Sequence, residues 1–75
     1  MTFIHTPEQL GQALRSARKQ LALTQPQLAL AAGVGVRFVV ELEAGKPTVR
    51  LVQVLRVIDA LGGTLQLTGL AVNVV

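Results

Sequence analysis

The sequence predicts a mainly α-helical domain with four short helices, followed by one short β-strand near the carboxyl end. Apolar residues recur every three or four positions through most of the chain, which is typical of amphipathic helices. Two threonines are each followed three residues later by glutamine, and glycines follow several of the periodic segments, as at helix starts and ends. Near the carboxyl end, a short segment alternates between polar and apolar residues, which indicates a strand.

The first helix is predicted from Pro7 to Leu21. Thr6 can cap its amino end, the proline suits its first turn, and Gln9 completes a capping box. Its inward face would carry the apolar residues that recur at helical spacing, namely Leu10, Ala13, Leu14, Ala17 and Leu21.

The second helix is predicted to begin after Thr24 and to end at Gly33, where a tight turn follows. The third would begin at Val36 and end before Gly45. Its valines favour a β-strand by propensity alone. A helix is preferred because tertiary packing can override propensity, and a helix would bury Val39 and Leu42 while exposing Arg37, Val40, Glu41 and Ala44.

The fourth helix has the clearest periodicity, with Leu51, Val54, Leu55, Ile58 and Leu61 on one face and two glycines after it. The strand is predicted at Thr64, Leu65, Gln66, Leu67 and Thr68. A lone strand has unpaired edges, so its simplest partner is the same strand of a second copy. The tail, residues 69–75, would either extend that sheet or lie flexible.

The composition fits a single domain, residues 1–75, without catalytic or metal-binding residues. There is no cysteine, and His5 has no second imidazole with which to share a metal, so we expect neither a metal nor a cofactor. Ser16, His5 and Asp59 contain the groups of a hydrolase triad, but nothing in their spacing organises them. We therefore expect no enzymatic activity.

Charge and hydropathy favour a soluble protein that binds nucleic acid. The net charge is +3, the basic residues lie before and after the middle of the chain, and the last 16 residues are uncharged. The longest charge-free runs, residues 20–36 and 60–75, are too short and too interrupted to span a membrane. No signal peptide is recognisable, so we expect a cytoplasmic location, at the nucleoid when DNA is bound.

Residues 25–43 have the spacing of a helix-turn-helix. Counted from Gln25 as position one, the fourth residue is apolar, the fifth is small where two helices cross, and the ninth is a glycine in the turn. The fifteenth and eighteenth residues face inward. These five positions are Leu28, Ala29, Gly33, Val39 and Leu42.

These residues carry a resemblance to the Xre/Cro repressor-type helix-turn-helix domain, which has the lambda-repressor-like fold. The resemblance lies in the segment LTQPQLALAAGVGVRFVVELEAGKPTVRLVQVLRVIDALGG. That family's first helix is resembled by the segment LGQALRSARKQLALTQ. The resemblance covers Leu10 to Gly63. Within it, LGGTLQLTG and VELEAGKPTVRL resemble HipB-like antitoxins of type II toxin-antitoxin modules. The resemblance as a whole implies a helical DNA-binding core at residues 7–62, a dimerisation strand at 64–68 and a tail at 69–75.

The resemblance also implies roles for individual residues. Bases would be contacted from the third helix, at Val36, Arg37, Phe38 and Glu41. Phosphates would be contacted from the start of the second helix and from the loop before the fourth, at Thr24, Gln25, Lys46, Thr48 and Arg50. An ion pair between Arg18 and Glu43 would brace the fold.

Plainer roles remain open for several of these residues. Lys46, Thr48 and Arg50 could each be only a solvated surface group. Arg37 can read a guanine bidentately, contact a phosphate or stay solvated. Glu41 can accept a hydrogen bond from cytosine or only orient Arg37, and Gln25 can serve simply in capping its helix. The chain also departs from the family pattern, with Ala22 where a glycine usually caps the first helix, and with apolar residues in place of polar ones at Leu30, Val36, Val40 and Val52.

Together these features predict a homodimeric repressor that binds a palindromic operator in double-stranded DNA. The resemblance to HipB-like antitoxins further implies an antitoxin that binds a HipA-like kinase toxin and represses its own operon. Two alternatives remain: a stand-alone phage-type repressor without a toxin, and a protein-interaction module whose helix-turn-helix no longer reads DNA.

Overall fold

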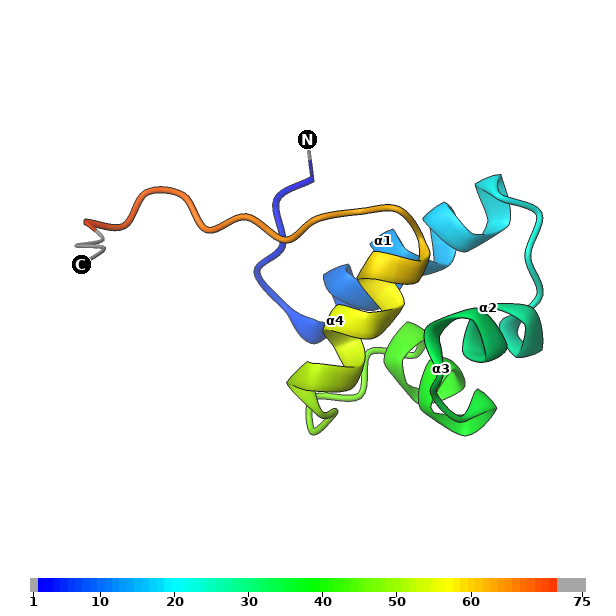
Figure 1. The fold of residues 1–75 in the computed structure, drawn as a ribbon. Helices are drawn as coiled ribbons and strands as arrows, with labels where there is room; N and C mark the ends of the chain where they lie inside the picture. Colours follow the sequence, from blue (N-terminus) through cyan, green and yellow to red (C-terminus); the bar gives the residue numbers. More distant parts are fainter. Residues whose placement is uncertain (1, 72–75) are drawn as a thin grey trace.

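The computed structural model describes residues 2–71, which form a helical fold with four helices (Figure 1). Their bounds are α1 Pro7–Gln20, α2 Gln25–Ala32, α3 Val36–Glu43 and α4 Leu51–Ala60. The four predicted helices are thus confirmed, and each ends one residue before the predicted carboxyl end. None of these helices has the length and apolar character that crossing a membrane requires.

The caps expected at the first two helices are present, with one difference. Thr24 and Gln27 form a complete capping box, in which the Thr24 hydroxyl accepts from the Gln27 N–H at 3.2 Å. At α1, Thr6 accepts from the Gln9 N–H at 3.1 Å, but the Gln9 side chain accepts from the N–H of His5 instead of that of Thr6. Both helix starts are therefore fixed by local side chains.

The core is small and wholly apolar apart from Arg18. Packing between α1 and α3, α2 and α3, and α2 and α4 brings its buried apolar residues together, namely Leu14, Leu28, Ala29, Val39, Leu42, Val54, Val57 and Ile58. Val39 and Leu42 are fully or almost fully buried, as predicted for a helical α3. Burial of this face explains why α3 is helical despite its valines, because an amphipathic face stabilises a short helix more than propensity does.

Gly11 lies where α1 crosses the carboxyl end of α3. A β-carbon at this position would lie 2.5 Å from the Leu42 carbonyl oxygen and 2.7 Å from the Glu43 carbonyl oxygen. Backbone atoms cannot move aside cheaply, so the two helices can approach this closely only at a glycine. The sequence pattern did not single out Gly11, because its partners are about 30 positions away along the chain.

Ala22, after α1, adopts a left-handed backbone conformation with φ of 57°. Among residues 2–71 it is the one non-glycine residue with positive φ. An L-residue in this region is destabilised by contact between its β-carbon and the neighbouring carbonyl. An alanine in the family's glycine position could leave this turn strained or rearranged, and the structure shows the strained form.

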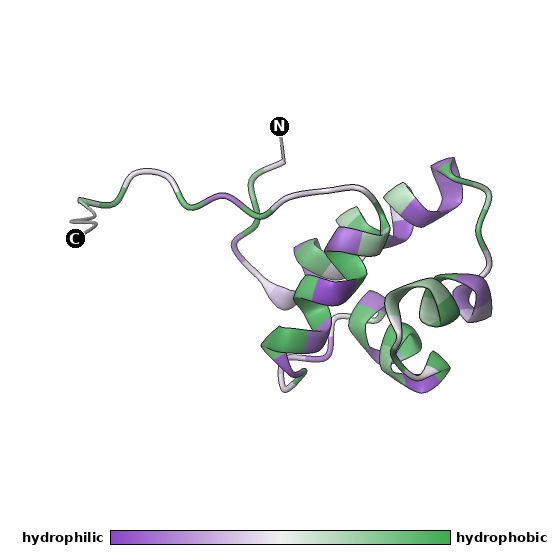
Figure 2. Ribbon diagram, viewed as in Figure 1, coloured by the Kyte–Doolittle hydropathy of each residue, from purple (hydrophilic) through white to green (hydrophobic). Residues whose placement is uncertain are grey.

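The segment after α4 extends away from the helices and carries exposed hydrophobic residues (Figures 1 and 2). Leu65 and Leu67 are 54% and 78% exposed. The strand predicted at residues 64–68 is not formed within residues 2–71, because a strand needs a paired neighbour and the described part of this single chain supplies none. Pairing with a second copy stays a prediction. Residues 72–75 of the predicted tail lie outside the described residues.

Candidate nucleic-acid interface

Helices α2 and α3 are joined by a turn whose geometry the glycines determine. Gly33 caps the end of α2 with φ of 70°, and Gly35 precedes the first residue of α3. The Val34 N–H donates to the Ala29 carbonyl at 3.0 Å, and Ala29 is buried where the helices meet. A larger side chain at Ala29 would separate the helices, so the small residue fixes how α3 lies against α2.

A buried ion pair fixes α3 against α1. The Arg18 Nε donates to Glu43 Oε2 at 2.7 Å and its Nη2 donates to Oε1 at 2.9 Å, so the pair is bidentate. The side chains of Arg18 and Glu43 are 10% and 4% exposed. Arg18 Nη1 also donates to the Leu23 carbonyl at 2.8 Å. The expected brace is therefore present and also fixes the loop between α1 and α2.

Gln25 belongs to the same network. Its Nε2 donates to Glu43 Oε1 at 3.1 Å, which joins the start of α2 to the end of α3. Burial alone would raise the pKa of Glu43, but hydrogen bonds from Arg18 and Gln25 lower that pKa below the usual glutamate value. The hydrogen bond to Glu43 raises the pKa of Arg18. Gln25 thus has a structural bond. Of the N–H groups in the first turn of α2, that of Gln27 donates to Thr24 and Pro26 has none, so the Gln25 N–H is the one suited to bind an anion.

Glu41 pairs with Lys46 and not with Arg37, the partner considered from the sequence. The Lys46 Nζ lies 2.8 Å from Glu41 Oε2, and this hydrogen bond lowers the pKa of Glu41. Gly45, with φ of 87°, reverses the chain, and the Lys46 N–H donates to the Glu41 carbonyl at 3.0 Å, as in a Schellman motif. The pairing therefore follows from the end of α3, and it joins one residue predicted to contact bases to one predicted to contact phosphates.

The outward face of α3 is exposed and carries apolar side chains beside a charged one. Arg37 is exposed, and Val36 and Val40 are 43% and 44% exposed. Phe38 differs from the sequence expectation, because it is half-buried and packs against the core. It precedes Leu42 by one helical turn and so shares the inward side. Val40, which was not among the predicted base contacts, occupies the exposed face in its place.

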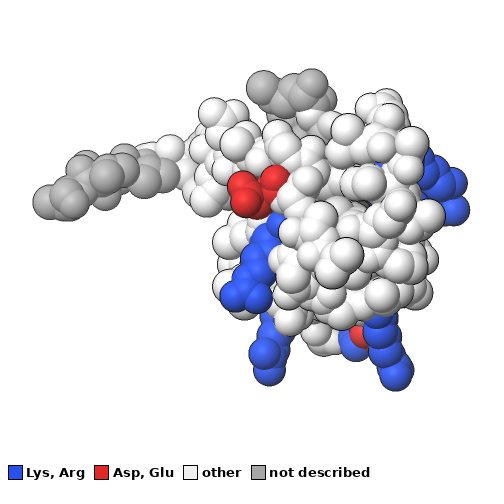
Figure 3. All heavy atoms as spheres, turned by 45° about the vertical axis from the view of Figure 1, so that its right-hand side comes forward, with Lys and Arg blue, Asp and Glu red and all other residues white. Residues whose placement is uncertain are grey.

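The loop between α3 and α4 presents polar and basic side chains. Lys46, Thr48 and Arg50 are exposed, while Val49 between them packs against the core and anchors the loop. Thr24 is likewise exposed at the start of α2. Figure 3 shows Lys and Arg side chains projecting from separate points around one face, with a broad uncharged surface between them. Exposed lysine and arginine side chains are groups that contact phosphates along a nucleic-acid backbone.

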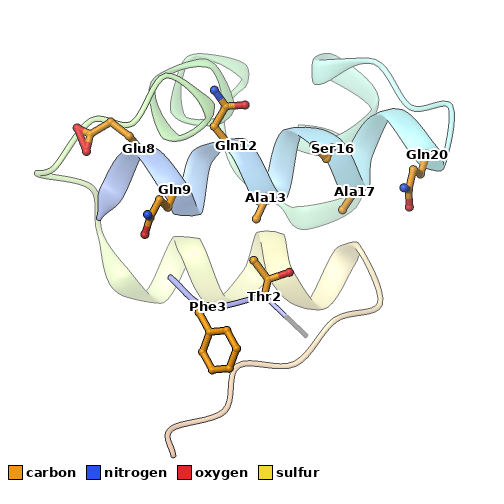
Figure 4. A pocket seen from close by; sticks show the side chains of 9 residues that line it. All are labelled: Thr2, Phe3, Glu8, Gln9, Gln12, Ala13, Ser16, Ala17 and Gln20. Carbon is orange, nitrogen blue, oxygen red and sulfur yellow. The ribbon is translucent and has the colours of Figure 1, made fainter. Parts of the chain in front are cut away.

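A separate hollow beside α1 offers no arrangement of catalytic groups. Figure 4 shows Ala13 and Ala17 directed from α1 toward α4, with Phe3 of the amino-terminal segment nearby. Ser16 lines this hollow, whereas His5 lines a different one beside the start of α4. The serine and histidine considered as a hydrolase pair are thus in separate places. Within residues 2–71, no three acidic or histidine side chains gather as a metal site.

Known proteins match this chain in both sequence and fold. Residues 9–70 match the model of a helix-turn-helix domain family. An uncharacterised HTH-type transcriptional regulator, y4mF of Sinorhizobium fredii (strain NBRC 101917 / NGR234), is 51% identical over 59 residues, which cover 79% of this chain and 78% of the relative.

Two solved structures share the fold, the HipB–O4 20mer complex and the HipA–HipB–O2–O3 complex. For each, the TM-score is 0.83 at 24% identity, covering 89% of this chain and 94% of the other. The family match and the y4mF match each cover most of this chain. The chain therefore belongs to the helix-turn-helix family of DNA-binding transcriptional regulators.

Proposed function

We propose that this chain is a homodimeric repressor that reads a palindromic operator through α3. The observation that carries the proposal is the outward face of α3, which is exposed while its inner face is fixed by the Arg18–Glu43 pair and the core. A recognition helix must be rigid relative to its scaffold to discriminate bases. Arg37, exposed on this face, has the bidentate geometry that guanine requires.

Phosphate contacts on both sides of α3 would orient that helix in the major groove. The amino end of α2 contributes the side chains of Thr24 and Gln25 and the Gln25 N–H, and the loop before α4 contributes Thr48 and Arg50. Lys46 would contribute in part, since Glu41 neutralises it. Residues 7–62 are thus the proposed DNA-binding core.

The proposed dimer forms through residues 64–68. Their exposed leucines would be buried if two copies paired antiparallel. Two α3 helices presented about 34 Å apart would read half-sites one turn apart. Replacing Leu65 and Leu67 together with Asp should give monomers in sedimentation and weaken operator binding. Dimers that persist would place the interface elsewhere.

The antitoxin role is proposed because the fold matches that of HipB, whose solved complexes contain the O4 20mer in one case and HipA with O2 and O3 in the other. In this proposal the chain binds a HipA-like kinase toxin in the cytoplasm and represses the operon that encodes both proteins. Co-purification with the kinase-like product of a neighbouring gene would support this role. If no such neighbour exists, the proposal reduces to a stand-alone repressor.

Fluorescence anisotropy with DNA from upstream of the gene tests the DNA-reading role. Arg37→Ala should weaken binding to that DNA by about tenfold or more, with a much smaller effect on random DNA. Arg56→Ala is the matched control, since Arg56 is also exposed but lies on α4. Equal losses on both DNAs would contradict base reading. Binding that is absent, or insensitive to salt, would favour a protein-interaction module.

A further inference from the structure

Two valines occupy the exposed face of α3 beside Arg37. Val36 and Val40 are 43% and 44% exposed, and they are four residues apart, so they lie one above the other on the helix. Arg37 precedes Val40 by three residues and shares the same side. An aliphatic surface thus lies next to the side chain most suited to guanine.

The scaffold does not require these valines. The core of α3 consists of Val39 and Leu42, and β-branched residues are weaker helix formers than alanine. Glu41, the carboxylate on this face, already accepts a hydrogen bond from Lys46 at 2.8 Å. The face therefore offers one strong donor group, Arg37, and two hydrocarbon groups.

Thymine is the base that matches a hydrocarbon side chain in the major groove. It presents a C5 methyl group there, whereas guanine, adenine and cytosine edges present donors and acceptors that a valine would leave unpaired. Val36 and Val40 are separated by roughly 6 Å along the helix axis, which exceeds the rise of one base pair, about 3.4 Å. They would therefore meet different base pairs.

We infer that Val36 and Val40 determine specificity by packing on thymine methyl groups. Each half-site would then combine thymines at two positions with a guanine contacted by Arg37. The inference rests on the proposed DNA-reading function, and it adds Val40 as a specificity residue. The phosphate contacts orient the helix, while Arg37 and the two valines select the bases.

Replacement of thymine by uracil tests this directly, because it removes only the methyl group. The probe is the duplex selected from a randomised 30-base-pair library by the full-length protein, with each thymine of one half-site replaced in turn. At the contacted thymines the Kd should rise about fourfold per methyl group. At the remaining thymines it should not change.

Protein variants then assign each methyl group to a side chain. Val40→Ala should abolish the effect of uracil at one position and Val36→Ala at the other, while each variant keeps the effect at its partner's position. Val52→Ala is the matched control, because Val52 is 56% exposed on α4, and it should retain both effects. Circular dichroism verifies that every variant is folded.

The outcomes separate the inference from the function on which it rests. A selected duplex that binds tightly but tolerates uracil at every position overturns the thymine inference and leaves DNA reading intact. Uracil effects that persist in both valine variants also overturn it. If the library yields no preferred duplex, both the inference and the proposed base reading fail.

Discussion

Arg18 on α1 and Glu43 on α3 form a bidentate ion pair, 2.7 and 2.9 Å long, in which both side chains are almost completely buried. The pair fixes the end of the recognition helix to the first helix of the fold. Gln25 donates to the same carboxylate, so three segments of the chain meet at Glu43. Under the proposed function, stability and DNA reading therefore depend on the same residue.

Removing one partner of this pair should be costly. Glu43→Leu leaves a buried guanidinium without its carboxylate and should lower the free energy of unfolding by about 3 to 5 kcal/mol. The double variant Arg18→Met with Glu43→Leu removes both charges and should recover most of that loss. Urea unfolding measures both variants. A double variant no more stable than the single one would contradict the uncompensated-charge explanation.

The lowered pKa of Glu43 predicts acid sensitivity. Because its folded-state pKa lies below the unfolded value of about 4.3, its contribution to stability is fully present above that pH and is lost as the pH falls through the folded-state pKa. The stability difference between the parent and Glu43→Gln should therefore shrink from pH 7 toward pH 3. A difference that stays constant over this range would show that the carboxylate charge does not stabilise the fold.

Gly11 should tolerate no side chain. Gly11→Ala places a β-carbon against the backbone carbonyls of Leu42 and Glu43 and should destabilise the fold by about 1 to 3 kcal/mol, although alanine is the better helix former. Gln12→Ala, on the exposed side of the same helix, is the control and should have little effect. Thermal unfolding followed by circular dichroism compares the two. Equal stability would mean that α1 and α3 can separate without loss.

Ala22 and Gly33 make a reciprocal pair of tests, because both have positive φ. Ala22→Gly relieves the strain and should stabilise the fold by about 0.5 to 1 kcal/mol, after allowing for the greater entropy of glycine in the unfolded chain. Gly33→Ala should destabilise it by about 1 kcal/mol through backbone strain alone, since no neighbouring atom lies within 4 Å of an added β-carbon. The melting temperatures of both variants and the parent, measured at one fixed protein concentration, test both expectations. Opposite signs are expected.

The helices could be predicted from the sequence because their signals are local. Threonine and glutamine three residues apart mark two starts, and Gly33 and Gly45 mark ends with positive φ. Even α3, which is rich in valine, was predictable once Val39 and Leu42 were required to face inward. The resemblance to a known family, and not spacing, indicated the Arg18–Glu43 pair.

Other features depend on the three-dimensional path of the chain, which places residues beside one another that no local pattern relates. The fit of Gly11 against α3 joins residues that no periodicity relates. The Glu41–Lys46 pair depends on the reversal at Gly45, which brings a loop residue back over the helix. Phe38 was expected to face DNA, but its position one turn before Leu42 directs it toward the core. Each of these requires three-dimensional packing in addition to sequence pattern.

The Glu41–Lys46 pair should limit phosphate binding. Glu41→Gln removes the carboxylate and leaves Lys46 free to neutralise a phosphate, so DNA affinity should rise on both operator and random DNA. The slope of log affinity against log salt should steepen by about 0.9 for each protomer. Asp59→Asn, an exposed change of equal charge on α4, is the control and should leave the slope nearly unchanged. If Glu41→Gln instead lowers affinity only for operators that carry a particular base pair, Glu41 reads that base. That result would overturn this account of the Glu41–Lys46 pair.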